Sequence, residues 1–332
     1  MPNTPSPAQP SDAGSGADAT AAIKVVNLHK SYKTDFWKPQ QTALQDLSFQ
    51  VQRRESFGFI GPNGAGKTTT IKILMGLLHA TSGQAWLLGK PVSDPKSRAR
   101  VGFLPERPYF YPHLSAREVL HFYGQLSELD KPTRERAIEG LLERVDLRRF
   151  ADVPLRKYSK GMLQRVGLCQ TLLHDPDLLV LDEPMSGLDP MGRALVRDLI
   201  LDRRARGNTV FFSSHILHDV ETLCDRVGLL VGGELRGCGT IGELISDRIR
   251  YTDCVFTGAP DVELPGEDIQ NERGLRRVRV SPDEVDALIS TVQAAGGQIV
   301  QVQPVRQTLE HVLLDQIDAS APVVTSELGV LA

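Results

Sequence analysis

A glycine-rich segment in the first quarter of the chain has residue types and spacing suited to holding phosphate. Residues 61–68 read GPNGAGKT and match the pattern G-x-x-x-x-G-K-[ST]. Glycines at this spacing let successive backbone N–H groups turn inward around phosphate oxygens at the start of a helix. We expect Lys67 to reach the β- and γ-phosphates of a nucleotide and Thr68 to hold Mg²⁺. The expected nucleotide contacts of this segment are Gly61, Pro62, Asn63, Gly64, Ala65, Gly66, Lys67, Thr68 and Thr69.

Two adjacent acidic residues, Asp182 and Glu183, follow a short apolar run at 178–181. An acidic pair after a strand is common and by itself indicates an ordinary turn, but strand ends also face the ligand crevice of open α/β sheets. With the phosphate-binding segment upstream, we expect Asp182 to bind the metal or its waters. Glu183 would orient or deprotonate the water that attacks the γ-phosphate in line, so Glu183 and Lys67 are candidate catalytic residues.

Three further motifs lie downstream of the glycine loop. Residues 158–165 read YSKGMLQR, residues 186–189 read SGLD, and His215 follows an apolar run that ends in two serines. In this order and spacing, and together with the glycine loop and the acidic pair, they resemble the ATPase subunit of ATP-binding-cassette (ABC) transporters over roughly residues 23–240. The variant YSKGM in place of LSGGQ, and the phrase VGFLPERPYFYPHLS at 101–115, resemble the ABC-2-type exporter branch in particular.

The signature segment around Ser159 allows two interpretations. Taken alone, Ser159 is a good N-cap, and Gly161 lies in a first helical turn whose N–H groups are free to bind an anion. The resemblance implies more: Ser159 and Gly161 would contact the γ-phosphate held by a second subunit, and Asp189 would belong to the nucleotide contacts. Two subunits, most simply identical chains, would then pack head to tail around two ATP molecules.

The resemblance also assigns three single residues. His215 matches the switch histidine that hydrogen-bonds the γ-phosphate and the attacking water, which makes it a third candidate catalytic residue. Tyr32 matches the aromatic residue that stacks on adenine, although Phe36 and Trp37 compete for that role. Glu106 stands where the family usually has Gln. It keeps an acceptor for Mg²⁺ but adds negative charge near the triphosphate.

As a whole, the resemblance implies the ATP-hydrolysing motor subunit of an ABC transporter of ABC-2 exporter type, which drives a separate integral membrane permease. Its cofactors would be ATP and Mg²⁺, and it would lie on the cytoplasmic face of the plasma membrane, attached through the permease. The aromatic residues Tyr109, Phe110 and Tyr111 would contact the permease or pack within their own subdomain. Two rivals stay open: a soluble ABC-type ATPase acting on ribosomes or DNA, and a catalytically silent module that dimerises on ATP because Glu106 disables turnover.

The composition of the chain argues against several classes of protein. The 332 residues are 41% apolar and 24% charged, which is typical of a soluble globular protein with two domains or one domain and an appendage. The net charge of −3 and the lack of a basic stripe predict no nucleic-acid partner. No apolar run reaches the roughly 20 residues that a membrane-spanning helix needs. The four cysteines form no CxxC pair, so neither a zinc site nor a disulfide framework is expected.

The elements that must position the motifs follow from hydrophobic periodicity. Alternation at Leu47, Phe49 and Val51 predicts a strand, and the apolar runs 177–182 and 209–213 predict buried parallel strands. The order of strand, glycine loop and helix opens an α/β nucleotide-binding fold. With the resemblance, we expect a P-loop NTPase core, an antiparallel β subdomain and an inserted helical subdomain at about 105–165.

The two ends of the chain differ from this core. Residues 1–22 are rich in Pro, Ser, Gly and Ala and predict a disordered tail, so the ABC ATPase domain would span 23–240. Residues 241–332 predict a small accessory α+β domain. We expect strands at 276–280 and 298–303 and helices at 283–294 and 308–317. The last helix resembles the closing helix of exporter ATPases, and regulation or steadying of the dimer is a hypothesis for this domain.

Overall fold

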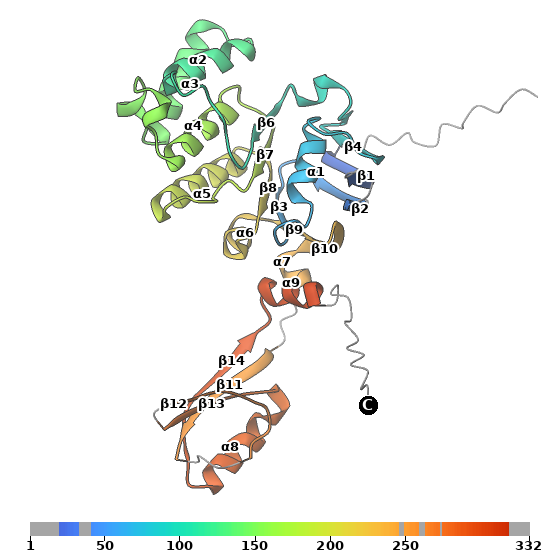
Figure 1. Cartoon of the computed structure of the whole chain (residues 1–332), viewed down its shortest axis with the longest axis vertical. Helices are drawn as coiled ribbons and strands as arrows, with labels where there is room; N and C mark the ends of the chain where they lie inside the picture. Colours follow the sequence, from blue (N-terminus) through green and yellow to red (C-terminus); the bar gives the residue numbers. More distant parts are fainter. Residues whose placement is uncertain (1–19, 33–40, 246–248, 259–262, 273, 319–332) are drawn as a thin grey trace, which may run out of the picture. The chain divides into compact units, whose positions relative to one another are not determined.

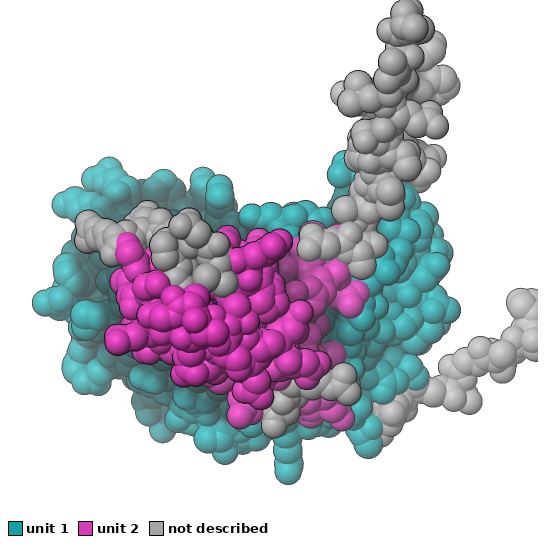
Figure 2. All heavy atoms as spheres, turned by 90° about the horizontal axis from the view of Figure 1, so that it is seen from below, with its two compact units in different colours: residues 1–238 teal, residues 239–332 magenta. Residues whose placement is uncertain are grey.

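Figure 1 shows the chain as a computed structural model, which describes residues 20–32, 41–245, 249–258, 263–272 and 274–318. Contacts divide the chain into two compact units, Met1–Cys238 and Gly239–Ala332, which are coloured separately in Figure 2. The division falls two residues before the boundary expected at 240. Within the described residues no helix has the length and apolar character needed to cross a membrane.

A six-stranded sheet in the order β10-β9-β3-β8-β7-β6 forms the centre of the first unit. Its strands are β3 (Ser56–Ile60), β6 (Val101–Leu104), β7 (Leu178–Asp182), β8 (Thr209–Ser214), β9 (Arg226–Val231) and β10 (Glu234–Thr240). The pairs within β9-β3-β8-β7-β6 are parallel. Because helices cover both faces, β3, β7 and β8 are buried along their whole length. This confirms the α/β fold class.

Helices flank this sheet on two sides. Figure 1 shows α1 (Lys67–Leu74) on one side of it and α5 (Pro190–Ala205) and α6 (Leu217–Leu223) on the other. The start of α5 is encoded locally, because the Asp189 carboxylate accepts a hydrogen bond from the Gly192 N–H at 2.9 Å and Pro190 occupies the first turn. Asp189 therefore has a structural role within its own chain.

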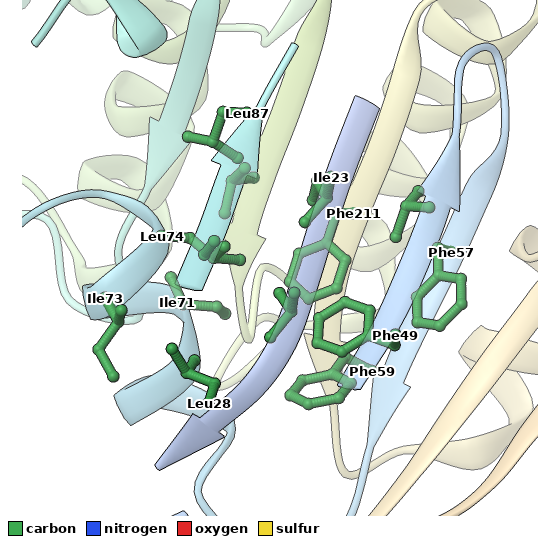
Figure 3. Close-up of a cluster of buried hydrophobic side chains, with 14 of the residues drawn as sticks. Ile23, Leu28, Phe49, Phe57, Phe59, Ile71, Ile73, Leu74, Leu87 and Phe211 are labelled. Atoms are coloured by element: carbon green, nitrogen blue, oxygen red, sulfur yellow. The ribbon is translucent and has the colours of Figure 1, made fainter. Parts of the chain in front are cut away.

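A second, antiparallel sheet packs against the first through aromatic rings. Its order is β2-β1-β4-β5, with β1 (Ala21–Tyr32), β2 (Gln41–Gln52), β4 (Ser82–Leu87) and β5 (Lys90–Pro91). Phe49 of β2 stacks on Phe57, Phe59 and Phe211, with ring centroids 5.9, 5.3 and 6.0 Å away (Figure 3). Burial of each ring contributes about 1.5–3 kcal/mol. The cluster thereby fixes β3, which leads directly into the glycine loop.

The helical subdomain is inserted between β6 and β7. It contains α2 (Ala116–Leu126), α3 (Lys131–Arg144) and α4 (Lys160–Leu172). Ser115 and Glu118 form a capping box at the start of α2, and α4 begins directly after Ser159, the N-cap expected from the sequence. Residues 105–115 precede α2 without helical structure, so the helices begin later than the predicted subdomain boundary.

The second unit is a four-stranded antiparallel sheet in the order β12-β13-β11-β14. Its strands are β11 (Ile249–Thr257), β12 (Glu267–Glu272), β13 (Leu275–Val280) and β14 (Gln298–Arg306). Helix α8 (Val285–Ala294) covers one face, where Phe256, Val280 and Leu288 share a small core. Helices α7 (Ile241–Leu244) and α9 (Leu309–Asp318) complete the unit, and 3₁₀ turns occur at Pro95–Arg98, Arg148–Phe150, Leu155–Lys157 and Pro282–Glu284.

Two further differences from the sequence-based expectations concern the start of the chain and the second unit. The predicted tail runs to residue 22, but β1 begins at Ala21, and Ala21 and Ala22 are buried because this strand pairs with β2. Residues 1–19 lie outside the described residues. In the second unit, β11 and β12 are not predicted by the sequence pattern, whereas β13, α8, β14 and α9 lie close to their expected positions.

Candidate nucleotide-binding site

The glycine loop forms one wall of a polar cleft of about 450 Å³ in the first unit. Most of the nucleotide contacts expected from the sequence line it. They are Tyr32, Pro62, Asn63, Gly64, Ala65, Gly66, Lys67, Thr68, Thr69, Glu106, Glu183 and His215. Residues from far apart in the sequence therefore converge on one volume with the size of a small-molecule site.

The loop itself joins β3 to α1 in a geometry that requires glycine. Gly66 precedes α1 with φ of 108°, a left-handed conformation that other residues rarely adopt. At Gly61 a side chain would place its Cβ 2.1 Å from the carbonyl oxygen of Leu230 on the neighbouring strand β9. The loop consequently turns tightly at the end of β3, and the first turn of α1 presents its unpaired N–H groups at the cleft.

Two charged side chains and a histidine meet inside the cleft. The Lys67 ammonium lies 3.4 Å from one carboxylate oxygen of Glu183 and also donates to the Gly61 carbonyl at 2.7 Å. The other carboxylate oxygen of Glu183 accepts a hydrogen bond from Nδ1 of His215 at 2.7 Å. Since Nδ1 is engaged in this way, Nε2 is the ring nitrogen of His215 left to contact a ligand.

The backbone of Glu183 is itself unusual. Its φ is 49°, a left-handed conformation that costs a non-glycine residue of the order of 1–3 kcal/mol. The Glu183 N–H donates to the Ser213 hydroxyl at 2.9 Å, which helps to hold this conformation. Strain of this kind is tolerated where the direction of a side chain matters, and here it directs the carboxylate toward Lys67 and His215.

Asp182 lies behind the cleft at the end of β7 and is only 2% exposed. It accepts a hydrogen bond from Ser213 at 2.6 Å and another from Thr68. Burial raises the pKa of the Asp182 carboxyl, and these two hydrogen bonds offset part of the rise. The Thr68 hydroxyl and the Asp182 carboxylate thus lie next to each other.

This pair suits Mg²⁺. Among the described residues, no group of three or more His, Cys, Asp or Glu side chains is arranged to hold a metal. Mg²⁺ does not need such a group, because it usually keeps several waters and binds through one or two protein oxygens together with substrate phosphates. Thr68 and Asp182 therefore fit a cation that a bound triphosphate would bring.

Tyr32 and Glu106 stand at the rim of the cleft. The Tyr32 hydroxyl lies 3.5 Å from the Thr69 hydroxyl, and the Lys30 ammonium sits over the Tyr32 ring at 5.2 Å from its centroid. The competing residues Phe36 and Trp37 lie outside the described residues. The Glu106 carboxylate is half-exposed and 3.6 Å from the Arg107 guanidinium, so its negative charge faces a cation.

The signature segment does not line this cleft. Ser159 caps α4 by accepting a hydrogen bond from the Met162 N–H at 3.2 Å, and it is exposed. Gly161 lies in the first turn of the same helix, and Asp189 caps α5. These three expected nucleotide contacts lie outside the pocket formed by the glycine loop of their own chain.

Three residues that line the cleft are not among the sequence-based candidates. Gln41 and Ala43 come from the start of β2, and Ser186 follows the Glu183 turn. Ser186 could have been predicted from the sequence, because it is the first residue of the SGLD motif. Gln41 and Ala43 carry none, since only the pairing of β2 with β1 brings them beside the loop.

The fold and the site together define a P-loop ATPase of the cassette class, and comparison with known proteins agrees. A match to the family described as ABC transporter spans residues 44–186. An ABC transporter ATP-binding protein of Synechocystis sp. is 41% identical over 301 residues, covering 89% of this chain and 84% of that relative. The chain therefore belongs to the ABC transporter family of ATP-binding proteins, whose members are ATPases.

Two further comparisons extend this result. The Nod factor export ATP-binding protein I of Ralstonia nicotianae is 35% identical over 264 residues, covering 79% of this chain and 78% of that relative. A solved ATP-binding subunit of an ABC transporter superposes with a TM-score of 0.62 at 31% identity. The superposition covers 67% of this chain and 91% of the solved subunit. The alignments with the two curated relatives cover larger shares of this chain.

Proposed function

We propose that this chain is the motor subunit of an ABC-2-type exporter and that two copies close around two ATP molecules to drive a separate membrane permease. Hydrolysis then removes the γ-phosphate that bridges the copies, and the dimer reopens. The cycle is a two-state equilibrium biased by a ligand. Membership of the ABC transporter family, and similarity to a protein named for Nod factor export, support the proposal.

One observation carries the proposal. The cleft brings together the glycine loop, Lys67, Glu183 and His215, yet the signature residues Ser159 and Gly161 lie outside it. The chain thus has a phosphate-binding cleft and, elsewhere, a separate helix tip whose N–H groups suit an anion. If the tip of one copy closes the cleft of another, both features are used, and two equivalent sites result by symmetry.

Each residue then has a defined task. Lys67 and the N–H groups of the loop bind the β- and γ-phosphates, and Tyr32 stacks on the adenine. Glu183 accepts a proton from the attacking water, while His215 holds the Glu183 carboxylate through Nδ1. When the ring carries a proton on both nitrogens, its Nε2–H donates to the γ-phosphate. Thr68 and Asp182, with Glu106 at the rim, would hold Mg²⁺, which would neutralise phosphate charge when bound.

The expected permease contact is supported by exposure. Tyr109 and Tyr111 are 82% and 63% exposed, whereas Phe110 packs edge-on against Tyr123 with centroids 6.4 Å apart. The two tyrosines thus offer amphipathic rings to a partner, while Phe110 serves the subdomain itself. Through this contact the chain would lie at the cytoplasmic face of the plasma membrane.

The rival functions receive less support. An ATPase acting on ribosomes or DNA would be expected to present a basic surface, and the net charge here is −3. A silent module would lack an intact base, but Glu183 is held between Lys67 and His215 in a strained, directed conformation. Glu106 is paired with Arg107, which reduces the cost of its charge beside a triphosphate.

The Glu183→Gln variant tests the proposal most directly. It keeps the shape of the side chain but removes the base, so hydrolysis is expected to fall about 100- to 10,000-fold while ATP binding persists. Phosphate release and ATP-dependent dimerisation should be measured on the same preparations. Full turnover in the variant, or no hydrolysis by the wild type even with its permease, would contradict the proposal.

A further inference from the structure

Gln164 is a buried amide side chain in the signature helix α4. It is 2% exposed, and its neighbours in the helix, Val166, Leu168 and Cys169, are buried apolar residues. Burial of an amide is unfavourable unless the amide is hydrogen-bonded, so an apolar side chain of similar size would be expected at such a position. The contacts of Gln164 should therefore show why a polar residue stands there.

The Gln164 amide reaches the turn that carries the proposed catalytic base. Its Nε2 donates to the Pro184 carbonyl at 3.4 Å. Pro184 directly follows Glu183 and is buried, and among the described residues no other donor to its carbonyl is found. Without Gln164 this buried carbonyl would lack a partner, which is unfavourable. The amide thus ties α4 to the peptide next to Glu183.

The same helix touches the rest of this turn at two more points. A Cβ at Gly161 would lie 3.4 Å from Cδ2 of Leu188, so the helix and this side chain are in close contact. A Cβ at Gly187 would lie 2.5 Å from the Lys160 ammonium nitrogen, so the Lys160 side chain runs against the backbone there. Residues 184–188 therefore lie along the first two turns of α4.

The backbone of Glu183 has to be held by such contacts. Its φ of 49° is left-handed, and a residue that precedes proline is normally driven to an extended conformation. No local preference therefore favours this geometry, and other elements must impose it. Ser213 of β8 binds the Glu183 N–H at 2.9 Å on one side of the residue. Gln164 binds the following peptide on the other side.

We infer that Gln164 is a positioning residue for Glu183, which holds the peptide after Glu183 so that the carboxylate keeps its direction toward Lys67 and His215. The inference rests on the proposed function, in which Glu183 is the base. Gln164 lies five residues after Ser159, about 7.5 Å along one rigid helix. Docking of the Ser159 tip on a partner's nucleotide then acts on the same helix that holds the base of its own chain.

The full-length chain carrying Gln164→Met is the material for the test. Methionine is unbranched and similar in size to glutamine but has no N–H, so it fills the site and removes the hydrogen bond. The kcat for ATP hydrolysis should fall about tenfold, because a small misplacement of a catalytic group slows the reaction strongly. The affinity for ATP should change less than about twofold, because Gln164 does not line the cleft. An unchanged kcat, or an equal loss of affinity, would overturn the inference.

A matched control comes from the same helix. Gln170 is half-buried in α4, six residues beyond Gln164. Gln170→Met should leave kcat unchanged, and the thermal unfolding midpoints of both variants should stay close to that of the wild type. Equal losses of kcat in the two variants would indicate a general disturbance of α4 and would also overturn the inference.

A double-mutant cycle with Glu183→Gln separates positioning from a merely structural role. If Gln164 acts through Glu183, adding Gln164→Met should change the residual single-turnover rate of the Glu183→Gln chain less than about twofold. A further loss of about tenfold would show that Gln164 acts independently of Glu183, and the inference would fail. Full turnover in the Glu183→Gln chain itself would count against the proposed function instead.

ATP-dependent dimerisation provides a readout other than activity. The Glu183→Gln chain is expected to retain ATP, so its nucleotide-bridged dimer can be followed by sedimentation. Adding Gln164→Met should change the dissociation constant of this dimer less than about twofold, because Ser159 and Gly161 are intact. A clearly weaker dimer would show that Gln164 supports the Ser159 tip and not Glu183, which would overturn the inference.

Discussion

The glycine-loop cleft and the signature tip both suit phosphate, but they are built to different degrees. In the cleft, Lys67, Glu183 and His215 already contact one another, and Asp182 is buried behind them with its hydrogen bonds made. At the tip, Ser159 is exposed and its hydroxyl caps α4. The difference supports the proposal that one chain completes the catalytic half of a site and offers the other half to a partner.

The contrast between cleft and tip predicts which variants alter nucleotide binding by a single chain. In the proposed arrangement a residue of the cleft acts on the nucleotide bound by its own chain, so changing it can alter nucleotide binding already in a monomer. A residue of the tip acts only after two copies meet, so changing it should leave monomer binding intact. A tip variant that lowers hydrolysis but leaves nucleotide binding by the monomer unchanged would support the distinction between cleft and tip. A tip variant that also weakens nucleotide binding by the monomer would contradict it.

Among variants that compare the tip with the cleft, the largest effect is expected from Gly161→Asp, which places a carboxylate where the γ-phosphate of the partner would dock. A side chain fits there, because a Cβ at this position would have Leu188 Cδ2 as its nearest neighbour, 3.4 Å away. Like charges in such a contact cost several kcal/mol, so hydrolysis should fall at least about 100-fold while ATP binding by the monomer changes less than about twofold. Phosphate release and fluorescent-nucleotide titration measure the two quantities.

The control for this variant is Gly140→Asp in α3. Gly140 is also helical and faces open space, so the same substitution there should leave hydrolysis unchanged. Mixing adds a stricter test. Lys67→Ala and Gly161→Asp chains are each expected to be inactive, but their heterodimer contains one site with an intact loop and an intact tip. Recovery of part of the activity on mixing is expected, and its absence would contradict the shared-site arrangement.

A smaller effect is expected for His215→Ala, which removes the 2.7 Å hydrogen bond to Glu183 and the candidate γ-phosphate contact. Loss of one positioned group of this kind should reduce single-turnover hydrolysis about 10- to 100-fold with little change in ATP affinity. His218→Ala, at an exposed position in α6, is the matched control. Unchanged hydrolysis in His215→Ala would remove this residue from the catalytic half of the site.

The same contrast explains what the sequence could and could not predict. The glycine loop, the Asp182-Glu183 pair and the caps at Ser159 and Asp189 depend on neighbours in sequence, and each follows from a local pattern. Gln41 and Ala43 reach the cleft only through the pairing of β1 with β2, which no local pattern encodes. The left-handed backbone of Glu183 likewise depends on Ser213 from another strand.

The missed strands of the second unit have a similar cause. In β11 the buried positions are Thr252, Cys254 and Phe256, so the inward face is only weakly apolar, while Val255 points the other way. The alternation that would indicate a strand is therefore blurred. Strand β12, EDIQNE, is an edge strand with almost no apolar residue, because an edge needs charge more than burial.

The smallest effect should come from Tyr32, at the rim of the cleft and away from the phosphates. Removal of a ring that stacks on one face of the adenine should weaken ATP binding about fivefold, which corresponds to the lower end of the stacking energy for an exposed base. Tyr32→Ala is the variant, Tyr32→Phe is the control that keeps the ring, and titration of ATP into the monomer is the measurement. Hydrolysis at saturating ATP should stay near the wild-type rate in both, because Tyr32 contacts Thr69 and Lys30 but none of the charged groups around Glu183. A fall in that rate with unchanged affinity would place Tyr32 with the catalytic residues instead of the base-binding rim.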